Sequence, residues 1–239
     1  ALKMLELKYK VGLNLNPYIG LDHMMKNIST KRNQEASNRI ASEAITLVKD
    51  SKGLLPIIAS PKDTLYIIDI YDQEYKHSLS TVASKIISER IPVRAIQVDE
   101  SDKKPILDVI VKSIPKNSQI LINAFVSPKE WKNRIFFPEN ETYFVRELIK
   151  KSDRIILASL GTPYLLQDFP KVSTYLCAYN GSYLMQNALA SALLGSKDIS
   201  GRLPISIPGL YEIGSGMFKE MKVKVEKISE YKPGIEVRR

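Results

Sequence analysis

The sequence predicts an α/β fold, a doubly wound and mostly parallel sheet with helices on both faces. Two observations lead to this prediction. From residue 33 onward, strand-length segments alternate with helix-length segments, and the strand-length segments are apolar throughout rather than at every second position. Strands of that kind are covered on both faces, and their alternation with helices is typical of parallel sheets. We expect about five central strands.

The expected elements follow one another with short connections. The strands are predicted at residues 64–70, 93–98, 118–124, 154–160 and 174–179. The helices are predicted at about 33–50, 78–90, 103–113, 139–152 and 182–195, with a short one that begins near Pro163.

The first of these helices, over residues 33–50, is predicted from a stripe of apolar residues. Ala36, Ile40, Ala44, Leu47 and Val48 recur at helical spacing, and Gly53 is placed as the helix terminator.

A proline-flanked segment, "ISGRLPISIPG" (199–209), closes the pattern. Proline has no backbone N–H for a sheet ladder and is confined to edges, strand starts and bulges. Residues 203–207 are therefore predicted to form an edge or isolated strand laid over the domain.

The positive charge lies mainly at the two ends of the chain. The net charge is +9, of which residues 1–32 carry +4, residues 219–239 carry +3 and the remaining residues carry +2. No recognition helix, zinc finger or aromatic RNA-binding signature accompanies it. We therefore expect no nucleic-acid partner. A nucleic-acid-binding protein remains an alternative that only the net charge suggests. No apolar run reaches the ~20 residues of a membrane span.

The sequence gives no sign of a cofactor or a metal. It has no phosphate-binding loop, no dinucleotide-binding glycine motif after an early strand and no nucleophile elbow. Cys177 is the only cysteine and is expected in the core. His23 and His77 are far apart and do not form a helical ligand pair.

One long connection (126–140) carries the candidate substrate-binding residues. Glu130, Trp131 and Arg134 combine an aromatic ring, a cation and an acid after the third predicted strand, which suits stacking on a sugar. Packing of these aromatics on the domain's own core, or on a neighbouring surface, is the preferred alternative. The turn "SLGTPYLLQDFP" (159–170) could hold an anion on free N–H groups, but a tight βα turn explains it equally.

Three motifs together resemble a known family. "EASNRIASEAITLVKDSKGLLPI", "SLGTPY" and "ALASALLG…SGRLPISIPG" are similar, in this order, to the C-terminal α/β sandwich domain of family 3 glycoside hydrolases. "ALKMLELKYKVGL" resembles the last helix of the (β/α)8 barrel that precedes that domain. "LCAY" and "GTPY" resemble the β-N-acetylhexosaminidase branch.

The resemblance implies a domain organisation and a partner. Residues 1–12 would be the end of the barrel, 13–32 a linker, 33–216 the sandwich domain and 217–239 a basic C-terminal arm or linker. The partner would be the N-terminal barrel of the same protein, which shares the carbohydrate substrate. The chain does not begin with methionine, so we expect a piece of a longer, bacterial-type protein. A periplasmic or secreted location is favoured over a cytoplasmic one.

The resemblance also implies that this chain holds no catalytic residue. The family's nucleophile is a barrel aspartate, and the hexosaminidase branch takes its acid/base histidine from a barrel loop. The glucosidase branch uses a glutamate on a loop of the sandwich domain, but Glu130 and Glu139 lie in no matching motif. A retaining glycosidase needs two such groups ~5–5.5 Å apart or a substitute for one. We therefore expect a glycoside hydrolase for β-N-acetylglucosaminides as the parent, and no activity from this chain alone.

Two alternatives stay open. The parent could be a β-glucosidase or β-xylosidase, or the chain could be a free-standing α/β module that binds a small ligand.

Overall fold

The computed structural model describes residues 1–18, 20–58, 63–72, 79–126 and 136–221. The chain divides into two compact units, Ala1–Ile40 and Ala41–Arg239. The candidate residues Glu130, Trp131 and Arg134 and the histidine His77 lie outside the described residues.

The N-terminal unit is helical. Helix α1 (Leu2–Lys10) forms where a short helix is predicted, and all of its residues, each of them described, are exposed. Helix α2 (Leu21–Asn27) lies within the stretch that was expected to be a linker. Helix α3 (Lys31–Ala44) begins in this unit and ends in the next one.

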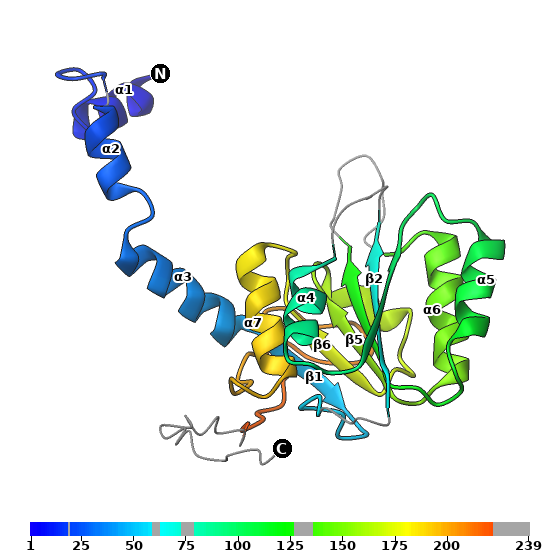
Figure 1. Cartoon of the computed structure of the whole chain (residues 1–239). Helices are drawn as coiled ribbons and strands as arrows, with labels where there is room; N and C mark the ends of the chain where they lie inside the picture. Colours follow the sequence, from blue (N-terminus) through cyan, green and yellow to red (C-terminus); the bar gives the residue numbers. More distant parts are fainter. Residues whose placement is uncertain (19, 59–62, 73–78, 127–135, 222–239) are drawn as a thin grey trace, which may run out of the picture. The chain divides into compact units, whose positions relative to one another are not determined.

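The second unit confirms the predicted fold class. Within the described residues, six strands form one sheet in the order β1-β6-β5-β4-β2-β3 (Figure 1). All neighbouring strands are parallel except β1 and β6, which are antiparallel. The strands are β1 (Thr46–Asp50), β2 (Leu65–Tyr71), β3 (Val93–Val98), β4 (Ile120–Phe125), β5 (Ile155–Ser159) and β6 (Thr174–Cys177).

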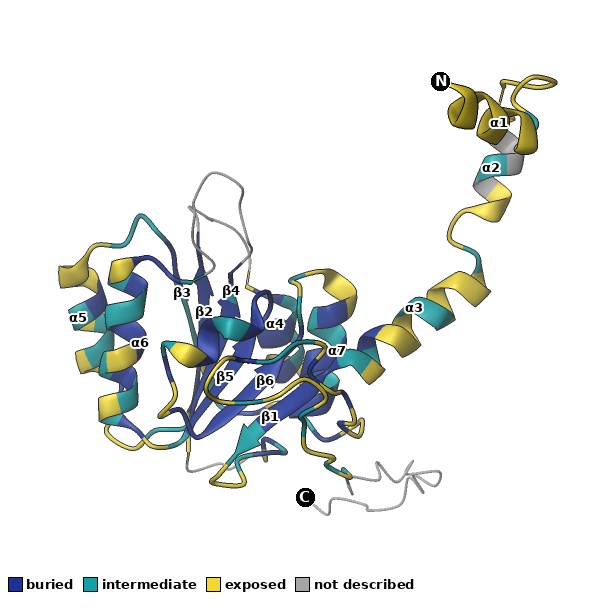
Figure 2. Cartoon of the chain, turned by 180° about the vertical axis from the view of Figure 1, so that it is seen from behind, coloured by how far each residue is buried: buried dark blue, intermediate teal, exposed yellow. Residues whose placement is uncertain are grey.

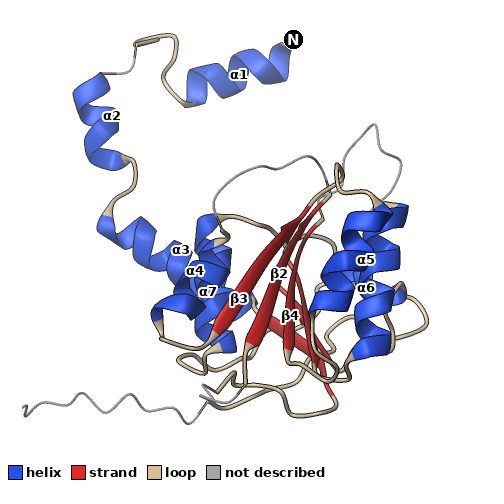
Figure 3. Ribbon diagram, turned by 45° about the vertical axis from the view of Figure 1, so that its right-hand side comes forward, coloured by secondary structure: helices blue, strands red, loops and turns tan. Residues whose placement is uncertain are grey.

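Helices cover both faces of the sheet (Figure 3). Helices α4 (Thr81–Ser88) and α7 (Tyr183–Leu193) lie on one face, and α5 (Lys104–Ser113) and α6 (Glu139–Lys151) lie on the other. A short 3₁₀ helix, η1 (Pro163–Gln167), follows β5 where a short helix is predicted.

The sheet divides the core into two layers. Successive side chains of a strand point to opposite faces, so Ile67 packs toward α4 while Ile68 packs toward α6. Both are fully buried, and Figure 2 shows the strands as the buried centre of this unit. This two-sided burial is the physical reason for the apolar runs in the sequence.

The helix predicted at 33–50 is confirmed as far as Ala44 and is wrong beyond it. Residues 46–50 form strand β1 instead, and Ile40 of the predicted buried stripe is 64% exposed. Thr46 and Val48 are β-branched residues that favour strands, and β1 pairs with β6 in a register that places Thr46 opposite Cys177. Gly53, with φ +63°, therefore lies in the turn after a strand rather than at a helix end.

The strand predicted in the proline-flanked segment is also wrong. Residues 203–207 form no strand, and only an isolated bridge joins Ile207 to Tyr211. Leu203 and Ile207 are buried in the core while Pro204 and Pro208 are exposed. The segment is thus anchored by its apolar side chains rather than by a ladder of hydrogen bonds.

The chain segment after it covers the free edge of β1. The Met217 N–H donates to the Leu47 carbonyl (2.7 Å), and the Lys219 ammonium contacts the buried Asp50 carboxylate at 2.5 Å. The Gly201 N–H donates to the Ile45 carbonyl (3.2 Å). Covering an edge strand in this way removes a surface on which another chain could pair.

Candidate functional site

The strand order places a switch point between β2 and β4. From β2 the chain moves outward to β3, then crosses back to β4 and continues in the opposite direction through β5 and β6. In open α/β sheets, ligands bind outside the carboxyl ends of the strands where the order reverses in this way. The end of the sheet at Tyr71 and Phe125 is therefore the candidate site, and we call it the β2/β4 edge.

A buried polar cluster lies directly beneath this edge. Asp69 of β2 and Asn123 of β4 are register partners, and both are almost fully buried. Asp69 accepts hydrogen bonds from the Ser80 N–H (3.0 Å), the Ser80 hydroxyl (2.9 Å) and the Asn123 amide (2.8 Å). Burial raises the pKa of Asp69, and these three donors oppose that rise.

This arrangement makes Asp69 an anchor rather than a nucleophile. Both of its oxygens are occupied by donors from β4 and from the start of α4. Ser80 is the N-cap of α4 and accepts the Ala83 N–H (3.1 Å), so the carboxylate fixes the helix start to the sheet. Asn123 Oδ1 is buried and has no hydrogen-bond partner among the described residues.

Aromatic and apolar side chains surround the edge above the cluster. The rings of Tyr71 and Phe125 stack with their centroids 4.6 Å apart. Leu79, Tyr183 and Leu184, at the starts of α4 and α7, are 38%, 69% and 37% exposed. Tyr71 is buried, so the exposed apolar surface comes from Leu79, Tyr183 and Leu184 at the helix starts. Such a surface can stack on sugar rings or pack on another domain.

The two helix starts are joined by hydrogen bonds. The Thr81 N–H donates to Gln186 Oε1 (2.8 Å), and the Gln186 amide donates to the Gly181 carbonyl (2.7 Å). A Cβ added at Gly181 would lie 2.9 Å from the Phe125 ring. The absence of a side chain at Gly181 is what lets this ring lie against the turn before α7.

The turn after β5 uses its N–H groups internally. The Leu160 and Thr162 N–H groups donate to the carbonyls of Ala124 (2.8 Å) and Val126 (3.1 Å), and the Thr162 hydroxyl accepts the Tyr164 N–H. These bonds occupy N–H groups that an anion would need. The structure therefore supports a tight βα turn over an anion site at residues 159–170.

Several carboxylates lie near the carboxyl ends of the strands. Asp72, Asp99 and Glu141 are buried and each has an interaction partner, and Asp99 accepts bonds from the backbone and hydroxyl of Ser101. Glu139 is exposed in the first turn of α6, where its charge complements the helix dipole. Structural roles account for Asp99 and Glu139.

Neither a metal nor a reactive thiol is found in the described part of the chain. No group of three or more His, Cys, Asp or Glu side chains there could hold a metal ion. Cys177 is fully buried, as the sequence predicts, and burial raises the pKa of its thiol to about 12. No helix in the described ranges is long and apolar enough to cross a membrane.

The polar cluster was not predicted from the sequence. Asp69 and Asn123 each interrupt an apolar run, "YIIDI" and "LINAF", and this shared interruption was the signal available. Glu130, Trp131 and Arg134 stay predictions because the structure does not describe them. In the sequence they follow Val126, the last described residue after β4.

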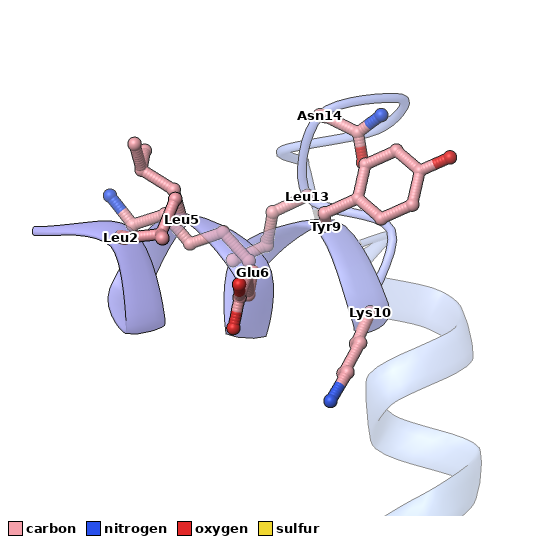
Figure 4. A pocket seen from close by; sticks show the side chains of 8 residues that line it. Leu2, Leu5, Glu6, Tyr9, Lys10, Leu13 and Asn14 are labelled. Carbon is pink, nitrogen blue, oxygen red and sulfur yellow. The ribbon is translucent and has the colours of Figure 1, made fainter.

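The N-terminal unit has a separate apolar hollow. Its volume is about 530 Å³, and its lining comes from α1 and the turn after it (Figure 4). Leu2, Leu5, Tyr9 and Leu13 contribute to it and are all exposed. This helix therefore presents an exposed apolar face.

The fold is thus an open, doubly wound α/β domain with its switch point at the β2/β4 edge, and solved structures share it. A glycoside hydrolase family 3 β-N-acetylglucosaminidase from Paenibacillus sp. str. FPU-7 matches 82% of this chain at 19% identity and a TM-score of 0.62. The β-glucoside phosphorylase BglX matches 83% at 22% identity and a TM-score of 0.60. A β-glucosidase from Listeria innocua matches 87% at 17% identity and a TM-score of 0.61.

These matches cover only part of the solved proteins. This chain spans 36%, 36% and 32% of the three chains in the order given. No family model matches the sequence, and no curated protein is significantly similar to it. At these identities the likeness establishes the fold.

Proposed function

We propose that this chain is the C-terminal, non-catalytic domain of a glycoside hydrolase that cleaves terminal β-linked sugars. The observation that carries the proposal is the shared fold. Enzymes whose names state action on β-glucosides or β-N-acetylglucosaminides contain this fold as about a third of their length. The sequence motifs that resemble family 3 domains support the same assignment independently.

The proposed substrate is a β-N-acetylglucosaminide. The motifs "LCAY" (176–179) and "GTPY" (161–164) support this choice, and one structural neighbour is a β-N-acetylglucosaminidase. The second candidate is a β-glucoside, which two other neighbours favour by name.

The proposed partner is a (β/α)8 barrel in the same protein. The apolar side of α1, with Leu2, Leu5 and Tyr9, is the surface that a barrel's other elements would cover. Burial of three such side chains stabilises an interface by roughly 1.5–3 kcal/mol each. This explains why a nine-residue helix would carry an exposed apolar face.

The β2/β4 edge is proposed to border the substrate cleft. Its exposed Tyr183 and stacked Phe125 supply aromatic surface, and Glu130, Trp131 and Arg134 follow in the adjoining connection. The chemistry is assigned to the barrel, because Asp69 is buried and fully hydrogen-bonded. This domain would bind and orient the sugar.

The test is hydrolysis of aryl β-N-acetylglucosaminide and aryl β-glucoside. We expect no product from the 239-residue chain, and turnover when the barrel is supplied covalently or in trans. In that reconstituted enzyme, Trp131→Ala should mainly raise KM, because a rim aromatic contributes equally to ground-state and transition-state binding. Phe218→Ala is the control, since Phe218 is 62% exposed beside β1, away from the β2/β4 edge.

The proposal fails if the isolated chain hydrolyses either substrate and Glu130→Gln or Glu139→Gln abolishes that activity. It also fails if a barrel-containing enzyme is equally active without this domain.

A further inference from the structure

A second hollow lies on the α6 side of the sheet, away from the β2/β4 edge. Its volume is about 330 Å³, at the lower end of the range for small-molecule sites. One wall is the second half of α6, and the other is the backbone of residues 168–171, which precedes β6. Since parallel strands begin at the edge opposite their carboxyl ends, this hollow lies at the amino edge of the sheet.

Cations dominate the lining of this hollow. Arg146 and Lys150 are one turn apart on α6, and Lys171 faces them from the other wall. Asp168 is the one acid in the lining. Lys150 pairs with Glu147 (2.6 Å), and Arg146 interacts electrostatically with Asp168 without a contact within 4.0 Å. Lys171 forms no ion pair with a carboxylate that the structure describes.

The hollow also has an apolar floor and a fixed backbone. Ile149, Phe169 and Pro170 line it, and Phe169 is only 1% exposed. The Phe169 N–H donates to the Leu166 carbonyl (3.2 Å), and the Val172 N–H donates to the Phe169 carbonyl (3.1 Å). Lys49 donates to the Pro170 carbonyl (2.8 Å), which holds the wall and adds another positive charge beside it.

We propose that this hollow, between α6 and residues 168–171, binds the carboxylate of an acidic sugar. Arg146 presents a planar fork of donors that matches a carboxylate, and Lys171 supplies a second charge from the opposite wall. The apolar floor suits the C–H face of the sugar ring. The choice of a sugar as the ligand rests on the proposed function. The choice of an anionic group rests only on the cations in the lining.

This hollow would be a second carbohydrate contact of the domain. The proposed cleft is at the carboxyl edge, and this hollow is at the amino edge, so one acidic glycan unit would bind without entering the cleft. The lining itself holds the cations Arg146, Lys150 and Lys171 and the carboxylate Asp168.

Binding can be tested on the 239-residue chain by NMR titration with D-glucuronate. Glucose is the matched neutral ligand, because it carries a hydroxymethyl group in place of the carboxylate. We expect glucuronate to shift the amide signals of residues 146–150 and 168–171, with a Kd in the millimolar range, and glucose to shift neither.

Charge-removing variants locate the site. Arg146→Gln and Lys171→Gln should each raise the Kd for glucuronate about tenfold, and thermal melting should show that both variants keep the fold. Lys116→Gln removes the same charge from an exposed position outside the hollow and should leave the Kd unchanged. Inorganic phosphate serves as the second anion.

Three results would overturn the inference: an equal loss of affinity in Lys116→Gln, equal signal shifts with glucose, or binding of phosphate without binding of glucuronate. None of them bears on the proposed function, which is measured by hydrolysis with the barrel present.

Discussion

Replacement of Gly161 by alanine should destabilise the domain through a single steric contact. A Cβ at this position would lie 1.7 Å from the Val126 carbonyl oxygen and 2.6 Å from its carbon. Both atoms belong to the backbone at the end of β4, so no side-chain rotation can relieve the overlap. The backbone of residue 161 is not in the left-handed region, and alanine adds no torsional strain there.

The loss of stability in Gly161→Ala follows from the backbone segments that must shift. Separation to normal contact requires Val126 or the β5 turn to shift by more than an ångström, and overpacking of this kind costs about 1–3 kcal/mol. The shift would also break the bond from the Thr162 N–H to Val126, whose net value is about 0.5–1.5 kcal/mol. The sum of about 1.5–4.5 kcal/mol would lower Tm by about 3–18 °C in a domain of this size.

Urea denaturation of Gly161→Ala against the wild-type chain measures this loss. Gly209→Ala is the matched control, because Gly209 has φ +76° and nothing within 4 Å of an added Cβ. It should lose only about 1 kcal/mol, from backbone strain. Stability of Gly161→Ala within 0.5 kcal/mol of wild type, by the same assay, would refute the close approach of β4 and the β5 turn (~0.5 kcal/mol being the usual surface-substitution range).

Three further predictions concern the buried carboxylate, the thiol and the N-terminal unit. Burial raises the pKa of Asp69 above its ordinary 3.8, so its stabilising contribution is complete below that value and is lost as pH rises through the folded-state pKa. The stability of wild type minus that of Asp69→Asn should therefore fall as pH rises from about 4, and a flat difference would contradict this. Cys177, with its pKa raised to about 12, should react with a thiol reagent at pH 8 only after unfolding; rapid labelling of the native chain would oppose its burial. Amides of Leu2 to Tyr9 should exchange with deuterium almost unprotected in the monomer, because α1 is exposed along its whole length; strong protection would show that it has a partner already.

The central strands could be predicted because their burial requires an apolar composition. A strand covered on both faces, such as β2 or β4, must be apolar at nearly every position, and that pattern needs no knowledge of its neighbours. Strand β1 was missed because Leu47 and Val48 fit the helical stripe that precedes them. Only pairing with β6, which places Thr46 opposite Cys177 and Asp50 opposite Thr174, decides for a strand. Pairing between positions so far apart in the sequence cannot be read from a local window.

The site could be predicted less well than the fold. Asp69 and Asn123 become neighbours only when β2 and β4 adopt one register, so each polar residue looks isolated in the sequence. Their carboxylate–amide bond also depends on Ser80, which reaches them from the start of α4. The tight turn at Gly161 was recognised as a turn, but its contact with Val126 required the packing of two strands.

The cover over β1 has a consequence for where the two described ends of this unit lie. The second unit begins at Ala41, and Met217, close to the end of the described residues, is hydrogen-bonded to Leu47 only a few residues from that beginning. The start of the unit and its last described residues therefore share one margin of the sheet. A unit whose two connections lie side by side can be inserted into a host loop, or circularly permuted through a short linker, without stretching either one. Tension applied through both connections would load the Leu47–Met217 bond and the Asp50–Lys219 ion pair first, and leave the parallel strands mechanically shielded.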